Sequence, residues 1–156
     1  MKVSFIAIGK TDETYLREGI SQYVKRLVHY LTFEYIELPL PKVKAGASST
    51  QKQEAEKTEL LKLLKLNDFL VLLDDKGKTH TSMQFAKFIQ QRFNDVPGNL
   101  VFLVGGAFGF HKEIYERANA QLSLSSLTFT HQMVRLIFLE QLYRAMTILR
   151  NEPYHH

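Results

Sequence analysis

Short apolar segments alternate along the chain with longer segments in which apolar residues recur at helical spacing. The short segments are rich in β-branched and aromatic residues and lie at about residues 3–8, 33–38, 69–73, 100–104 and 121–124. The longer segments are typical of amphipathic helices, and the last one spans about residues 131–149. Strands that alternate with helices indicate an α/β domain. We therefore predict a single α/β domain over residues 1–156, with a mostly parallel sheet flanked by helices.

The most loop-like part of the chain lies at residues 42–53, where lysines are mixed with small and polar residues. We expect a loop there and a helix over about residues 54–64 after it. The next helix is expected to begin at a cap formed by Thr81 or Ser82, because a hydroxyl side chain satisfies free N–H groups of a first turn.

The composition excludes several classes of protein. Hydrophobic residues make up 45% and charged residues 23%, as in an ordinary globular protein. No apolar run approaches the roughly 20 residues that cross a bilayer, and no A-x-A-like cleavage site follows the apolar N-terminus. The chain contains no cysteine, which excludes disulfides and thiolate metal sites. We expect a soluble cytoplasmic protein, whose net charge of +4 permits a nucleic-acid partner without requiring one.

A glycine-rich turn, Gly105-Gly106-Ala107-Phe108-Gly109, follows the fourth predicted strand. Glycine lets backbone amides approach a ligand because it has no Cβ. Ligands of open α/β sheets also bind at the carboxyl ends of the strands. The pattern differs from the G-x-G-x-x-G of dinucleotide-binding proteins, so two interpretations stay open: a site for a nucleotide-like ligand, or a tight turn alone.

Two segments resemble the end of a phosphate-binding loop, at residues 9–11 and 77–79. The glycine that this motif requires five residues earlier is replaced by Ser4 in one and by Leu72 in the other, which argues against an NTPase. Asp74 and Asp75 are adjacent at a strand end and point to opposite faces, so a solvated turn is favoured over a shared ligand. No histidine pair has the spacing of a zinc site, and we expect no metal.

Two arginines interrupt the most apolar helix of the chain. A free charge among apolar side chains is costly, so Arg135 and Arg144 each require a partner. Glu140 lies four positions before Arg144 and can pair with it on the helix surface. A carboxylate, a second subunit and an RNA phosphate all remain open as partners.

The serine-rich segment at residues 122–129 joins the last strand to the last helix. Its small hydroxyl residues leave backbone groups free to contact a ligand. Taken alone, the segment is better explained as a loop that caps the helix.

Several motifs run through the chain in a fixed order. The most specific are V-G-G-A-F-G at 104–109 and L-S-S-L-T-F-T-H-Q-M-V-R at 124–135. I-A-I-G-K at 6–10, E-Q-L-Y-R-A at 140–145 and P-Y-H at 153–155 complete them. In the order and spacing of these motifs and in length, the chain resembles the ribosomal RNA large subunit methyltransferase H family. Members of that family are pseudouridine N3-methyltransferases of the SPOUT class.

This resemblance implies a deep trefoil knot, formed when the last helix threads through a loop. Such knots are essentially absent from most proteins, and periodicity does not reveal them. The knot and the site for S-adenosyl-L-methionine (SAM) are expected within about residues 69–156. The resemblance also implies a homodimer in which the second subunit helps to complete the site.

The SAM pocket implied by the resemblance is formed by three segments at the carboxyl ends of neighbouring strands. Its residues are Leu73, Gly105, Leu124, Ser125, Ser126, Leu127, Thr128 and Phe129. This placement agrees with the interpretation of the glycine-rich turn as a ligand site. A pocket of this kind binds its ligand through backbone groups and shape rather than through a conspicuous side-chain motif.

The reaction implied is methylation of N3 of a pseudouridine in 23S ribosomal RNA, on assembled ribosomes. The polar residues expected near the target base are His131, Arg135, Arg144, Tyr154 and His155. Either arginine is a candidate to stabilise the imide anion, and His155 is a candidate base because its unperturbed pKa lies near neutrality. The tail at 151–156 lacks apolar surface to hold itself in place and is expected to order over the substrate.

Two rival classes of function remain. A nicotinamide-dependent oxidoreductase needs an acidic residue about 20 positions beyond a glycine-rich first turn, and the turn after Ile8 contains only Gly9. A non-catalytic ribosome- or RNA-binding protein with a vestigial nucleotide pocket remains open as the alternative.

Overall fold

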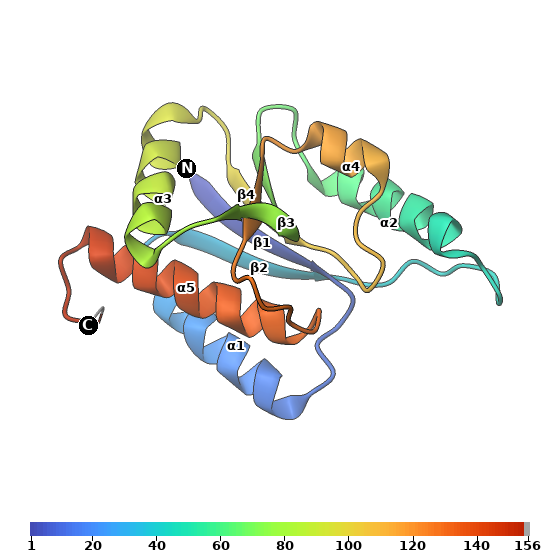
Figure 1. The fold of residues 1–156 in the computed structure, drawn as a ribbon, viewed down its shortest axis with the longest axis horizontal. Coiled ribbons are helices and arrows are strands. Elements are labelled where there is room, and N and C mark those ends of the chain that lie inside the picture. Colours follow the sequence, from blue (N-terminus) through green and yellow to red (C-terminus); the bar gives the residue numbers. More distant parts are fainter. Residues whose placement is uncertain (155–156) are drawn as a thin grey trace.

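A five-stranded sheet forms the centre of the computed structural model, which describes residues 1–154 (Figure 1). The strands are β1 (Lys2–Ile8), β2 (Thr32–Leu38), β3 (Phe69–Thr79), β4 (Leu100–Val104) and β5 (Ala120–Ser123). The helices are α1 (Thr14–Leu27), α2 (Ser49–Leu63), α3 (Ser82–Asp95), α4 (Lys112–Arg117) and α5 (Met133–Leu149). All strand pairs are parallel, in the order β2-β1-β4-β3-β5, which confirms the predicted fold class.

Helices cover both faces of the sheet (Figure 1). Helices α1, α3 and α5 pack on one face, and α2 and α4 pack on the other. Successive side chains of a strand point to opposite faces, so Phe5 of β1 packs toward the first group of helices and Ile6 toward the second. Because both faces are covered, the central strands are apolar throughout rather than alternating.

Helix α2 begins inside the segment that was predicted to be a loop. The Ser48 hydroxyl accepts a hydrogen bond from the Gln51 N–H (3.1 Å), and the Gln51 side chain accepts one from the Ser48 N–H (2.9 Å). This reciprocal cap satisfies two donors of the first turn. The prediction of a loop over 42–53 was therefore wrong beyond Ser48, and the S-x-x-Q spacing was the motif that indicated the helix. Thr81 caps α3 in the same way.

Strand β3 continues to Thr79 instead of ending at Leu73 as predicted. Leu73 pairs with Leu122 of β5, and after an irregularity Lys78 pairs with the same residue. The intervening segment therefore passes directly against β5. A Cβ added to Gly77 would lie 2.6 Å from backbone atoms of Leu122, so only glycine fits at this crossing.

We expect Gly77→Ala to lower the free energy of unfolding by about 2 kcal/mol or more, because two backbone segments would have to separate. Gly46→Ala is the matched control: its φ of +78° is unfavourable for alanine, but its Cβ would meet no atom within 4 Å. The control should therefore lose only about 1 kcal/mol. Urea denaturation at equilibrium measures both, and equal losses would show that the crossing at Gly77 tolerates a side chain.

Candidate functional site

A cavity of about 480 Å³ opens beside residues 73–75 of β3 and the carboxyl ends of β4 and β5. Its lining includes every residue of the predicted cofactor set except Ser126, namely Leu73, Gly105, Leu124, Ser125, Leu127, Thr128 and Phe129. Ser126 is exposed and lies outside the lining. These three segments are adjacent because Leu73 of β3 pairs with both Val104 of β4 and Leu122 of β5. Parallel pairing thus gathers segments that are far apart in the sequence.

Gly105 shapes the cavity by leaving room for a neighbouring side chain, which its position in the sequence did not indicate. A Cβ added there would lie 3.2 Å from the ring of Phe110, which also lines the cavity. The missing side chain therefore makes room for an aromatic wall residue. Phe110 is buried and packs edge-on against Tyr115, with ring centroids 5.6 Å apart.

The serine-rich segment both lines the cavity and precedes α5. The Ser123 hydroxyl donates to the Ser125 carbonyl (2.9 Å), and the Ser125 hydroxyl accepts from the Leu127 N–H (2.9 Å). Thr130 accepts a hydrogen bond from the Met133 N–H (3.2 Å) at the start of α5. The segment therefore lines the cavity, whereas the bond to the first turn of α5 comes from Thr130 just beyond it, and the N-cap residue Gln132 makes no side-chain cap bond.

Asp74 is a cavity residue that the sequence analysis missed. Its carboxylate accepts hydrogen bonds from the Tyr115 hydroxyl (2.6 Å) and the Lys76 N–H (2.8 Å). Burial favours the neutral acid, but these hydrogen bonds outweigh it and hold the pKa of Asp74 below its ordinary value. Burial and the Asp74 carboxylate raise the pKa of Tyr115 to about 12. With Asp75, which also lines the cavity, Asp74 makes this wall negative at neutral pH.

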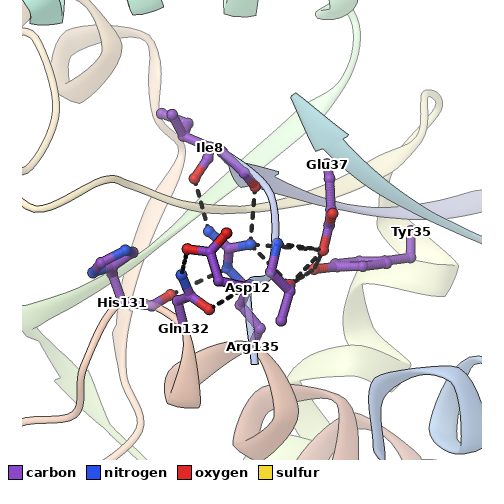
Figure 2. A network of polar contacts seen from close by, with 9 residues as sticks. Ile8, Asp12, Tyr35, Glu37, His131, Gln132 and Arg135 are labelled. Atoms are coloured by element: carbon purple, nitrogen blue, oxygen red, sulfur yellow. Dashed lines mark hydrogen bonds and ion pairs between the residues drawn. The ribbon is translucent and has the colours of Figure 1, made fainter. Parts of the chain in front are cut away.

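Arg135 lies in the interior rather than on the surface (Figure 2). Its guanidinium donates to the carbonyls of Ile8 (2.8 Å) and Gly9 (2.9 Å) and to the Thr11 hydroxyl (3.0 Å). The Glu37 carboxylate lies 3.7 Å away. Of the three partners left open for this arginine, the structure thus supplies a carboxylate, together with two main-chain carbonyls.

Neighbouring groups complete this network (Figure 2). Glu37 accepts hydrogen bonds from the Thr11 hydroxyl and from the Tyr35 hydroxyl (3.0 Å). Burial raises the pKa of Tyr35 to about 12, so its phenol remains a donor at neutral pH. The Gln132 side chain accepts a hydrogen bond from the Asp12 backbone N–H (2.8 Å) and donates one to the Asp12 carboxylate (2.7 Å). The start of α5 is therefore joined to the segment after β1 by several polar contacts.

Arg144 and Tyr154 form a second polar group, near the other end of α5. Arg144 pairs with Glu140 (2.6 Å), as their spacing predicted. Its guanidinium carbon lies 4.9 Å from the centre of the Tyr154 ring, and the Tyr154 hydroxyl donates to Glu140 (3.3 Å). The tail was expected to lack the apolar surface that would hold it in place, but as far as Tyr154 it is anchored by an aromatic ring stacked on a cation. His155 lies outside the described residues.

The four described residues of the set predicted near the substrate, His131, Arg135, Arg144 and Tyr154, do not gather in one place within one chain. His131 is exposed beside the cavity, and Arg135 is buried one turn further along. Arg144 follows after a helical rise on the order of 13 Å. The roles of these residues in a reaction remain predictions.

Residues 1–154 contain no group of three or more acidic or histidine side chains that could hold a metal ion. No helix in this part of the chain is long and apolar enough to cross a membrane.

A cavity at the carboxyl ends of an open parallel sheet defines an α/β ligand-binding protein. A family model described as "Predicted SPOUT methyltransferase" matches residues 1–155. A ribosomal RNA large subunit methyltransferase H from Cytophaga hutchinsonii is 52% identical over 100% of both chains. Another from Parabacteroides distasonis is 51% identical over 100% of this chain and 99% of its own length. The chain therefore belongs to the SPOUT methyltransferase family.

We expect Arg135→Lys to lower the free energy of unfolding by about 3 kcal/mol, because lysine keeps the charge but cannot reach the same acceptors. Arg144→Lys is the matched control on the same helix. Its side chain is 26% exposed, so the loss should stay below about 1 kcal/mol. Chemical denaturation tests the pair, and a variant at position 135 as stable as the control would contradict the structural role of Arg135.

Proposed function

We propose that this chain transfers a methyl group from SAM to N3 of a pseudouridine in 23S ribosomal RNA, within assembled ribosomes. The observation that carries the proposal is the cavity formed by β3 and the ends of β4 and β5, in a chain that matches large-subunit rRNA methyltransferases over its full length. Ribosomes as the substrate place the protein in the cytoplasm.

The residues of this cavity fit SAM. Its volume of about 480 Å³ lies in the range of small-molecule sites, and Leu73, Leu127 and Phe129 offer apolar walls for an adenine ring. Backbone groups of the serine-rich segment can hydrogen-bond the base. The carboxylates of Asp74 and Asp75 complement the positive charges of SAM, whose sulfonium supplies an activated methyl group when bound.

A homodimer accounts for features that one chain leaves incomplete. Leu127 is 76% exposed and Phe129 38% exposed at the mouth of the cavity, an unfavourable position for two large apolar side chains. Arg144 of α5 and Tyr154 beyond the end of this helix do not line the cavity of their own chain. We infer that a second copy covers the mouth and brings its Arg144 and tail toward the substrate, with Arg144 facing the developing imide anion.

The trefoil knot belongs to the same proposal. Residues 74–79 pass against β5 at Leu122, and the chain that leaves β5 continues into α5. This crossing supports a loop after β3 through which the C-terminal segment has passed. The knot and the SAM site would then share residues 69–156 within one domain spanning residues 1–156.

Transfer of radiolabelled methyl groups from SAM to ribosomes tests the proposed function. We expect labelled rRNA with the unmodified protein and at least about tenfold weaker binding of S-adenosylhomocysteine by Gly105→Val, because the new side chain displaces Phe110 from the cavity wall. Gly46→Val, whose Cβ would meet no atom within 4 Å, is the control for binding. Binding of S-adenosylhomocysteine without methyl transfer would favour the non-catalytic alternative.

Light scattering at micromolar concentration should give about twice the chain mass of 18.1 kDa. Leu127→Asp should shift the protein toward the monomer, because it places a charge at the proposed contact. Leu66→Asp, at a site that is 92% exposed away from the cavity, should leave the dimer intact. A monomer that still methylates ribosomes would refute the shared site.

A further inference from the structure

A second cavity, of about 560 Å³, adjoins the first. It lies between the segment after β1, the segment after β2, the first half of α2 and the glycine-rich turn. The two cavities share Gly106, Ala107 and His131 in their linings. A ligand in the second cavity would therefore be separated from one in the first only by this shared wall.

The walls of the second cavity combine apolar surface with lysines. Leu40 and Phe108 are 64% and 57% exposed, although large apolar side chains are normally buried. The Lys52 ammonium lies 5.6 Å from the centre of the Phe108 ring, and Lys10 also lines the cavity. An aromatic ring beside lysines is the arrangement with which proteins bind a nucleobase and its phosphate.

Among the described residues that line this cavity, Glu56 is the only acid without a hydrogen-bond or ion-pair partner. No described residue donates a hydrogen bond to its carboxylate or forms an ion pair with it. Asp12, the other acid in the lining, is bonded to Gln132. Burial raises the pKa of Glu56, as expected where no donor compensates for lost water.

The Glu56 carboxylate lies against the wall that the two cavities share. A Cβ added to Gly106 would be 3.6 Å from its Oε1 atom. Water reaches this carboxylate, and a ligand N–H that replaces the water would form a charge-assisted hydrogen bond with it. The donor is thus expected close to Gly106, on the side of the cavity that faces the first cavity.

We propose that the second cavity binds the nucleotide to be methylated, through an imide base of the uracil type whose N3–H donates to the Glu56 carboxylate. Leu40 and Phe108 contact the base, and Lys10 and Lys52 contact the phosphate. A base with an unprotonated or substituted N3 cannot donate this hydrogen bond. That the bound nucleotide is the one to be methylated rests on the proposed function. The binding of a uracil-type base in this cavity does not.

The probe is uridine 5′-monophosphate, titrated into the ¹⁵N-labelled protein and followed by the amide resonances. Binding should move the amides of Leu40, Val43 and Phe108. 3-Methyluridine 5′-monophosphate, which keeps the phosphate and loses only the N3–H, should bind at least about fivefold more weakly. Cytidine 5′-monophosphate should also bind more weakly, because its N3 carries no hydrogen.

Glu56→Ala should abolish the preference for uridine over 3-methyluridine monophosphate. Glu59→Ala is the matched control on the same helix, since Glu59 pairs with Lys62 (2.6 Å), and it should keep the preference. Equal binding of the two nucleotides to the unmodified protein, or shifts confined to residues 124–129, would overturn the assignment. A preference retained in Glu56→Ala would overturn it as well.

Methyl transfer to ribosomes gives an independent readout. Glu56→Ala should lose at least about tenfold in rate while its affinity for S-adenosylhomocysteine stays unchanged, because Glu56 lies outside the first cavity. Full activity in this variant would overturn the assignment. The nucleotide titration does not depend on methyl transfer, so an inactive unmodified protein would contradict the proposed function alone.

Discussion

The buried guanidinium of Arg135 joins the first turn of α5 to the end of β1, and the candidate site depends on this connection. Its hydrogen bonds to the carbonyls of Ile8 and Gly9 cross between segments that are more than a hundred residues apart in the chain. Backbone carbonyls at a strand end need donors, and a buried arginine needs acceptors, so each group offsets the desolvation cost of the other. The start of α5 is thereby placed beside the sheet, and His131 is placed at the wall between the two cavities.

The glycine-rich turn after β4 contributes to the walls of both cavities. On one side, Gly105 makes room for Phe110 in the wall of the proposed SAM site. On the other, Gly106 lies next to the unpaired carboxylate of Glu56. A methyl donor and its acceptor must lie close together and in fixed orientation for transfer between them. Gly106, which has no side chain, keeps the wall between the two cavities thin.

The residues predicted for the cofactor site follow from one rule of parallel sheets, that the carboxyl ends of adjacent strands meet at one edge. This rule, with the resemblance, was enough to bring Leu73, Gly105 and the segment at 124–129, except Ser126, to one cavity. Their role in binding a cofactor remains a prediction. The rule did not point to Asp74, whose role depends on a hydrogen bond from Tyr115. It also did not point to Glu56, whose carboxylate has no hydrogen-bond partner among the described residues. Neither property has a sequence pattern, because both depend on side chains that only folding brings near.

The alternation of apolar strands with amphipathic helices determined the α/β class, since burial on both faces of a parallel sheet requires that pattern. The capping spacing at Ser48 likewise determined where α2 begins, although it was overlooked in favour of composition. Tertiary structure alone decided that Arg135 is an interior connector while Arg144 stays near the surface. Two arginines on one apolar helix look alike in sequence. What distinguishes them is the set of acceptors that each meets, and those acceptors come from β1 for one and from the helix itself for the other.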